Sequence, residues 1–257
     1  MIPNERYPDI RVHAWGWDPN SNQQEVWRDM IHPNLGLVQY SRNYELARPG
    51  DIAFVNRTSD ATMAAQTPEK WKFAVLGDER NVHGPSGHRE TPKRYMARLQ
   101  EANEILQNAG IPTSSAGLAM GGGRFDRSYQ HDIKDFGDYS GQNFRTTRFD
   151  RAVSGMQRMR DTVWFPTVIP LRLNWWPIKY NTLGIWLWQT FLAPGMEVQM
   201  RRLLANPANV SVGIWCLREG KLGDGHWQGW HGLIDRGNRL TWQGRIVKRL
   251  LEEHDDG

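Results

Sequence analysis

Short apolar runs with the character of β-strands recur along the whole chain and alternate with helical segments. The runs cover residues 10–17, 35–40, 51–56, 72–77, 112–120, 135–139, 163–173 and 210–217. Helical periodicity marks residues 23–31, 91–110, 144–160, 182–204 and 244–253. Strands that alternate with helices favour a parallel sheet, and eight of them in 257 residues fit a closed barrel. The sequence therefore predicts an α/β fold, a single (β/α)8 TIM barrel, with residues 1–257 as one domain.

Two other architectures are disfavoured by what the sequence lacks. A doubly wound dinucleotide-binding sheet would carry Gly-x-Gly-x-x-Gly after its first strand, and no such pattern follows residues 10–17. A membrane protein would need an apolar stretch of about 20 residues. No stretch approaches that length, so we expect no membrane partner.

The start of the sequence lacks the charged and then apolar pattern of a signal peptide. The compartment stays unknown, because cytoplasmic expression, secretion to the cell surface after removal of a leader, and a phage-type release route all remain open. The single cysteine, Cys216, lies in an apolar run and is expected to be a buried, inert thiol.

The clearest helix of the chain follows the fourth run. Thr91 is a suitable N-cap, Pro92 fits the first helical position, and Gly110 ends the helical period. The fourth run itself ends in Gly77, Asp78 and Glu79. A carboxylate pair therefore stands at the end of a strand and a short loop before a helix, where a barrel enzyme carries its chemistry.

Residues that follow the ends of barrel strands are the candidates for a ligand site, because the C-terminal ends of all eight strands meet at one mouth. These ends combine aromatic rings with amide, guanidinium and carboxylate groups, and that mixture suits a carbohydrate. The predicted substrate-binding residues are Trp15, Trp17, Asn56, Arg57, Asp78, Tyr139, Asn174, Trp175, Trp176 and Trp215.

The segment with Gly77, Asp78 and Glu79, followed by a loop and a helix, resembles the fourth strand of clan A glycoside hydrolases. In that clan, Gly-Asn-Glu carries the general acid/base, so the resemblance implies this role for Glu79. Trp215 at the eighth strand, residues 135–139 at the sixth and a closing helix after residues 232–238 are also similar to that clan. The chain departs from the clan at the seventh strand, where a nucleophilic Glu is usual, because residues 163–174 contain no carboxylate.

Glycoside hydrolysis usually needs a second carboxyl group. Asp138, at the end of the predicted sixth strand, is the best-placed partner for Glu79, and a separation of about 6.5–9.5 Å would suit an inverting mechanism. Glu219 is the other option, four residues beyond Trp215. Asp78 points away from Glu79 if the strand is regular, so we expect it to bind a substrate hydroxyl or an Arg side chain.

The formal charge of +4 comes from basic residues that are interleaved with acidic ones. This pattern does not favour nucleic acid, although binding through Trp and Arg is a third and weaker reading. Arg favours an acidic glycan, because its guanidinium pairs with carboxylates at two points. The His pairs lack the His-Glu-x-x-His spacing of a metal site, and no phosphate-binding loop is present, so neither a metal nor a cofactor is expected.

Two functions remain after these exclusions. The first is a glycoside hydrolase acting on a polysaccharide or oligosaccharide, with Glu79 as general acid/base and Asp138 as the candidate second carboxylate. The alternative is a non-catalytic carbohydrate-binding or structural module on a glycosidase-like barrel. The missing seventh-strand carboxylate supports the alternative. Oligomeric state is open in both cases.

Overall fold

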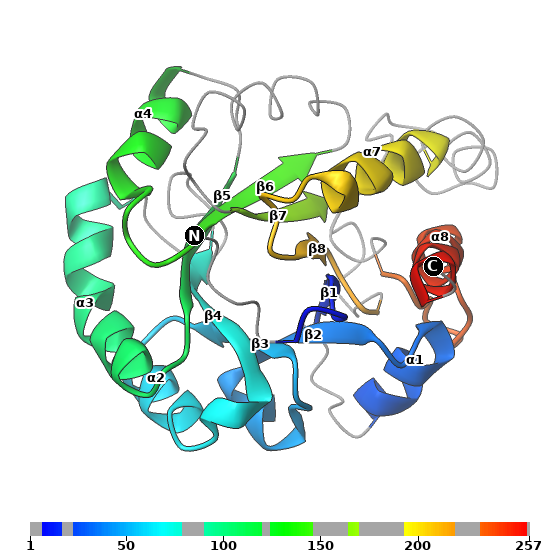
Figure 1. Cartoon of the computed structure of the whole chain (residues 1–257), viewed down its shortest axis with the longest axis horizontal. Coiled ribbons are helices and arrows are strands. Elements are labelled where there is room, and N and C mark those ends of the chain that lie inside the picture. Colours follow the sequence, from blue (N-terminus) through cyan, green and yellow to red (C-terminus); the bar gives the residue numbers. More distant parts are fainter. Residues whose placement is uncertain are drawn as a thin grey trace.

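The computed structural model describes residues 7–16, 23–78, 90–119, 124–145, 164–169, 193–218 and 232–255. Eight parallel strands in these ranges form a closed barrel in which each strand pairs with its neighbours in chain order (Figure 1). The strands are β1 (Val12–Trp15), β2 (Leu35–Tyr40), β3 (Asp51–Val55), β4 (Trp71–Asp78), β5 (Thr113–Ala119), β6 (Ser140–Arg145), β7 (Trp164–Ile169) and β8 (Val212–Ile214). The predicted (β/α)8 barrel is confirmed. The assignment of all 257 residues to one domain stays a prediction.

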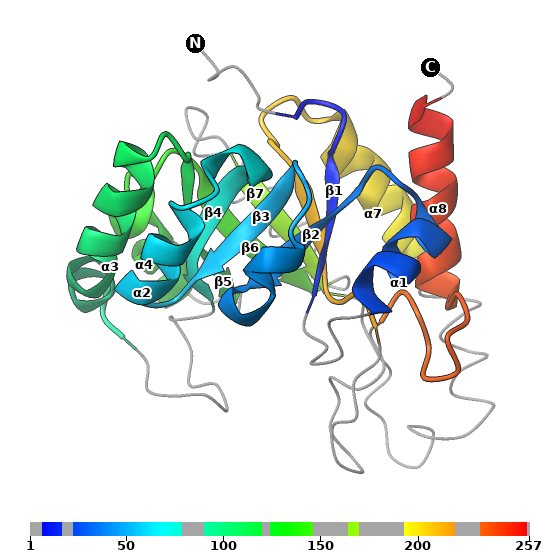
Figure 2. The same ribbon diagram turned by 90° about the horizontal axis from the view of Figure 1, so that it is seen from below.

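Helices lie around the outside of the barrel (Figure 1). They are α1 (Gln24–Ile31), α2 (Thr58–Ala64), α3 (Pro92–Asn108), α4 (Arg124–Ile133), α7 (Ala193–Ala205) and α8 (Trp242–Asp255), with 3₁₀ turns η2 (Ser41–Leu46) and η3 (Pro68–Lys70). In the side view, the start of β1 and the end of α8 lie on the same side of the barrel (Figure 2). The C-terminal ends of the strands therefore face the opposite side.

Local signals located most of the first half of the barrel correctly. The run at 35–40 is β2, and α1 begins within one residue of its expected start. The side chain of Thr91 accepts a hydrogen bond from the backbone N–H of Arg94, 3.3 Å away, with Pro92 at the first helical position of α3. Gly110 has a positive φ of 72° beyond the helix end, which glycine adopts without strain.

The sixth strand was predicted wrongly. Residues 135–138 form a turn and a bend, with Gly137 at a φ of 103°. Tyr139 makes an isolated parallel bridge with Ser114, and β6 begins only at Ser140. The segment Ser140 to Asn143 is polar, so it carries no apolar alternation, yet its backbone pairs with both β5 and β7 in the closed sheet. The start of the helix predicted at 144–160 belongs to β6, and its remainder lies outside the described residues. Tertiary pairing overrides local pattern here.

Other boundaries shift for local reasons. Pro194 and Gly195 do not interrupt a helix but lie in the first turn of α7, where a proline is tolerated. The eighth strand is shorter than the predicted 210–217, and the peptide bond between Trp215 and Cys216 after it is cis. Helices α2 and α4 were not predicted.

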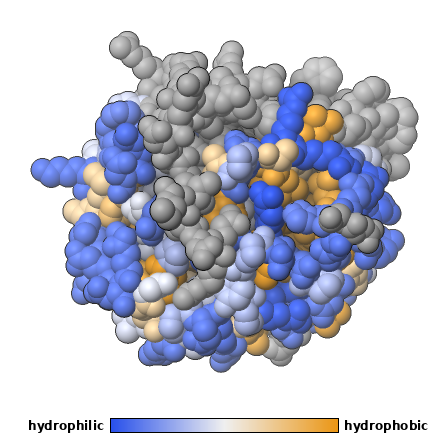
Figure 3. Space-filling model, in the orientation of Figure 1, coloured by the Kyte–Doolittle hydropathy of each residue, from blue (hydrophilic) through white to orange (hydrophobic). Residues whose placement is uncertain are grey.

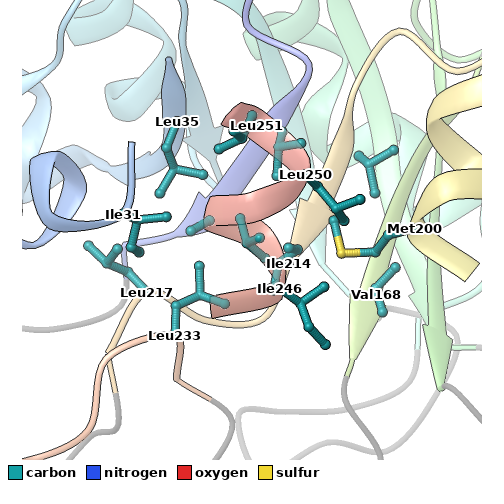
Figure 4. Packing of buried hydrophobic residues seen from close by; sticks show 14 of the residues in the cluster. Ile31, Leu35, Val168, Met200, Ile214, Leu217, Leu233, Ile246, Leu250 and Leu251 are labelled. Atoms are coloured by element: carbon teal, nitrogen blue, oxygen red, sulfur yellow. The ribbon is translucent and has the colours of Figure 1, made fainter. Parts of the chain in front are cut away.

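In the described part of the chain, the buried hydrophobic residues pack in three clusters. One joins α1, α7 and α8 to β1, β2, β7 and β8, as Figure 4 shows for Ile31, Met200, Ile214 and Leu250. A second joins α2, α3 and α4 to the strands on the other side of the barrel. The third fills the barrel interior and consists of Trp15, Val38, Ile52, Phe73, Val75, Tyr139, Phe165, Val210 and Cys216. Cys216 is buried, as predicted.

The outer surface is mainly polar. On the face shown in Figure 3, hydrophilic residues predominate over the helices, and hydrophobic residues are seen between them. Among the described residues, no helix combines the length and apolar character that crossing a membrane requires.

A buried ion pair anchors α1 to the sheet. The guanidinium Nη2 of Arg28 lies 2.8 Å from Oδ2 of Asp51, and both side chains are at most 3% exposed. The Asp51 carboxylate also accepts from the backbone N–H groups of Leu37 at 2.8 Å and of Arg48 at 3.1 Å. Asp51 therefore links β2, β3, α1 and the turn after η2 through one charge.

A buried histidine occupies the interior of the barrel near the N-terminal ends of the strands. His13 is fully buried, and its Nε2 lies 2.8 Å from the carbonyl oxygen of Gly50, while Nδ1 contacts the hydroxyl of Ser211. Its ring fills the space left by Gly36 on β2, since a Cβ there would lie 2.3 Å from the ring. Burial, with the nearby charge of Lys72 adding to it, lowers the pKa of His13 to about 3.

This shift predicts a loss of stability in mild acid. The unfolded chain protonates His13 below its ordinary pKa of about 6.5, whereas the folded chain does so only near 3. The free energy of unfolding should therefore fall as pH drops through this window, by up to about 3 kcal/mol between pH 6.5 and 4. In urea titrations, the free energy of unfolding of His13→Gln should fall by correspondingly less over this pH range. The control is His131→Gln, at a side chain 71% exposed, which should follow the unaltered chain; parallel pH curves for His13→Gln and the unaltered chain would contradict the prediction.

Candidate functional site

The end of β4 presents Asp78 at the C-terminal mouth of the barrel. Gly77 has a positive φ of 78°, which interrupts the regular alternation of side chains just before Asp78. The strand nevertheless keeps its pairing with β5, since Asp78 is opposite Gly117. Asp78 is half-buried.

A side chain from β6 holds Asp78. The amide Nδ2 of Asn143 donates to Oδ1 of Asp78 at 2.9 Å, and Asn143 is 5% exposed. The Asn143 side chain lies directly over Gly117, where an added Cβ would be 2.3 Å from Oδ1 of Asn143. An amide on β6 thus crosses β5 to reach a carboxylate on β4.

Among the described residues, four aromatic rings gather at the same end of the barrel, and we call Trp15, Tyr40, Phe54 and Trp215 the aromatic cluster. The ring centroids of Trp15 lie 5.6 Å from those of both Phe54 and Trp215, and Tyr40 and Phe54 are 4.8 Å apart. Trp15 is only 1% exposed, whereas the other three are partly exposed. Trp15 therefore forms the floor of the cluster and the other three form its surface.

The electrostatics of Tyr40 connect this cluster to the polar residues. Burial raises the pKa of Tyr40 well above its usual range, and the charges of Asp78 and Cys216 act in the same direction, while Arg42 opposes them. The guanidinium carbon of Arg42 lies 5.8 Å from the centroid of the Tyr40 ring. Asp78 and Arg42 thus both lie within electrostatic reach of Tyr40 at the mouth.

Asn56 and Arg57 follow β3 as the sequence predicted. Their backbone N–H groups both donate to Oδ2 of Asp60, at 3.0 and 3.1 Å, and the carbonyl oxygen of Asn56 accepts from Nη1 of Arg98 at 2.8 Å. These bonds anchor the start of α2. They give the backbone of both residues a structural role at the rim, next to the mouth.

Asp138 and Tyr139 lie at the wrong end of the barrel for the roles predicted for them. Oδ2 of Asp138 accepts from the backbone N–H of Thr113, the first residue of β5, at 2.8 Å. Asp78, in contrast, pairs with Gly117, which lies four residues beyond Thr113 on β5, or about 13 Å further along the strand. Tyr139 is 3% exposed and packs edge-on against Phe73 inside the barrel. Because β6 starts later than predicted, these two residues precede the strand instead of ending it.

Several predicted site residues lie outside the described residues. They are the proposed acid Glu79, the alternative second carboxylate Glu219, and Trp17, Asn174, Trp175 and Trp176. Within the described ranges, no three His, Cys, Asp or Glu side chains are grouped so that they could hold a metal ion.

Sequence reasoning missed three residues that the fold brings to the mouth. Tyr40 ends β2, and its alternation with Val38, which faces the interior, was a usable signal. Phe54 alternates with Ile52 in the same way. Asn143 carried no signal, because its strand was placed too early in the chain.

Comparison with solved structures agrees with this architecture, whereas no family model and no curated protein matches the sequence. The fold is the (β/α)8 barrel found in glycoside hydrolases. A GH128 endo-β-1,3-glucanase from Sorangium cellulosum is 12% identical, with a TM-score of 0.62 over 93% of this chain and 97% of that one.

Two further structures extend this likeness. A GH128 exo-β-1,3-glucanase from Cryptococcus neoformans is 11% identical, with a TM-score of 0.63 over 93% of this chain and 98% of that one. A GH128 oligosaccharide-binding protein from Trichoderma gamsii is 12% identical, with a TM-score of 0.57 over 99% of this chain and 96% of that one. At these identities the likeness concerns the fold, and it includes both enzymes and a binding protein.

Proposed function

We propose that this chain binds a glycan at the C-terminal mouth of its barrel and hydrolyses it with Glu79 as general acid/base. The observation that carries the proposal is the meeting of the aromatic cluster with the Asp78–Asn143 pair at one end of the barrel. Aromatic faces stack on the apolar faces of sugar rings, and a carboxylate accepts hydrogen bonds from sugar hydroxyls. The similar barrels of the two GH128 glucanases support this choice.

The proposed reaction has two parts at the glycosidic bond. Protonated Glu79 gives its proton to the leaving oxygen as the bond to the anomeric carbon breaks. Water then takes the place of the leaving group and loses a proton to a second carboxylate. We no longer propose Asp138 as that second carboxylate, because it lies at the end of the barrel opposite the mouth. Glu219 is the remaining candidate from the sequence.

A second candidate function is carbohydrate binding without turnover. It is favoured by β7, whose sequence from Trp164 to Ile169 contains no carboxylate, and by the similar barrel of the oligosaccharide-binding protein from Trichoderma gamsii. The aromatic cluster and Asp78 would serve this function unchanged. The two candidates therefore share a ligand site and differ in chemistry.

A glycan panel tests both candidates. It should include β-1,3-gluco-oligosaccharides, because of the similar barrels, and acidic glycans, because Arg42 lies at the mouth. We expect tryptophan fluorescence to shift with at least one glycan and reducing ends to be released from it. Trp215→Ala should weaken that binding about tenfold, because stacking of a ring on a sugar is lost.

The matched control for Trp215→Ala is Trp242→Ala, at the first residue of α8, whose partly buried ring packs against the cluster that joins α1, α7 and α8. This variant should bind the same glycan with unchanged affinity. Binding without release of reducing ends would favour the second candidate. A fluorescence signal that stays constant across the whole panel would exclude both.

A further inference from the structure

We propose that Asn143 is a positioning residue that orients the Asp78 carboxylate toward the glycan, and that Gly117 is the residue that permits this. The inference rests on the proposed glycan site and adds to it a residue that does not itself need to touch the ligand. Its basis is a contact between two strands that are not neighbours.

The geometry leaves one route for this contact. Strand β5 lies between β4 and β6, and neighbouring strands are about 4.8 Å apart, so β4 and β6 are separated by roughly 10 Å. The Asn143 side chain spans this gap by lying over Gly117, with Nδ2 2.9 Å from Asp78 and 3.5 Å from the carbonyl oxygen of Gly117. A Cβ at position 117 would lie 2.3 Å from Oδ1 and 2.9 Å from Cγ of Asn143. Any larger residue at position 117 would therefore displace the amide.

The chemistry of the two groups determines which end of the Asn143 amide faces Asp78. An ionised carboxylate can only accept hydrogen bonds, so the amide must turn its N–H₂ group toward Asp78. A donor held at Oδ1 favours the charged form of Asp78 and restricts rotation of the carboxylate about its side chain. Because Asn143 is 5% exposed and confined by β5, its amide is a rigid support.

The orientation matters because of what lies beside Asp78. The charge of Asp78 acts on the phenol of Tyr40, whose ring belongs to the surface of the aromatic cluster. A sugar stacked on this surface would meet the carboxylate at its edge. Fixing the carboxylate in advance lowers the entropy lost on binding, so the amide should contribute to affinity without contacting the glycan.

The test measures glycan affinity, pH dependence and thermal stability for a set of matched variants. The glycan is the best binder of the panel to the unaltered chain. Asn143→Leu removes the donor at similar size, and Gly117→Ala displaces it. Each should weaken binding about tenfold and move the acid-side loss of binding to higher pH, because the donor no longer favours the charged carboxylate. The double variant should be no worse than either single variant, since both remove the same contact.

The exchange variant Asp78→Asn with Asn143→Asp separates positioning from support of the fold. It restores an amide–carboxylate hydrogen bond but moves the charge to β6. We expect its thermal midpoint to recover toward that of the unaltered chain while its glycan binding stays weak. Recovery of binding together with stability would show a merely structural role and overturn the inference.

The remaining outcomes distinguish this inference from the proposed function. If Asp78→Asn weakens glycan binding but Asn143→Leu and Gly117→Ala keep full affinity and lose binding at the same acid pH as the unaltered chain, the inference is wrong. The proposed glycan site would then stand. If the unaltered chain binds no glycan of the panel, the proposed function and the inference fall together.

Discussion

Glu79→Gln is expected to lower the rate of reducing-end release at least 100-fold while glycan affinity stays within about twofold. Glutamine has nearly the size of glutamate and keeps its hydrogen-bonding reach, but it has no acidic proton to give to the leaving oxygen. General acid catalysis contributes about 10²–10⁴ to the rate, so its loss should be visible in single-turnover assays. Affinity is measured separately by tryptophan fluorescence with the same glycan.

The control for this experiment is Glu104→Gln, which makes the same chemical change on the exposed surface of α3. It should leave both rate and affinity unchanged. Asp78→Asn is expected to behave differently from Glu79→Gln, because it removes the charge and replaces one of the two acceptor oxygens by an N–H₂ donor, and it should raise the glycan dissociation constant. Undiminished cleavage by Glu79→Gln would remove Glu79 from the mechanism.

Asp51→Ala is expected to lower the free energy of unfolding by about 3–5 kcal/mol, the largest stability effect that we foresee. Removing this carboxylate leaves the guanidinium of Arg28 buried without its counter-charge and removes the acceptor of the Leu37 and Arg48 N–H groups. Urea or thermal unfolding at pH 7 measures the change. A loss of that size approaches half of the stability of a typical domain.

The control is Asp29→Ala, which breaks an ion pair with Arg48 at the surface, where the two side chains are 54% and 33% exposed. Exposed pairs contribute about 0–1 kcal/mol, so this variant should be nearly neutral. Adding Arg28→Met to Asp51→Ala should recover part of the loss, because no charge is then left buried. Equal losses in Asp29→Ala and Asp51→Ala would contradict our account of the buried pair.

The elements that were predicted well have signals that depend on nearby residues. The apolar run from Leu35 to Tyr40 and the cap at Thr91 belong to a strand and a helix whose signals occur within a few residues. The barrel class followed from counting such elements and from their order. For the site, this reasoning correctly placed Asp78, Asn56, Arg57 and Trp215 directly at or beyond strand ends.

The errors came from a strand without an apolar period. Ser140, Gly141, Gln142 and Asn143 are polar or small, so nothing local marks them as β-structure. Their place in β6 depends on pairing with residues 118–119 on one side and 164–169 on the other. Shifting this strand by five residues was enough to assign a catalytic role to Asp138, which caps the opposite end of the barrel.

The sequence by itself determined where most of the strands and several of the helices lie, because hydrophobic periodicity and capping are local properties of the chain. It also determined that a carboxylate stands at the end of the fourth strand. Only the tertiary structure decided which residues accompany Asp78. Asn143 is 65 positions away and reaches it because the sheet closes with β5 between them and because Gly117 has no side chain to obstruct the amide. Contacts of this kind depend on strand register across a closed barrel, which no local pattern encodes.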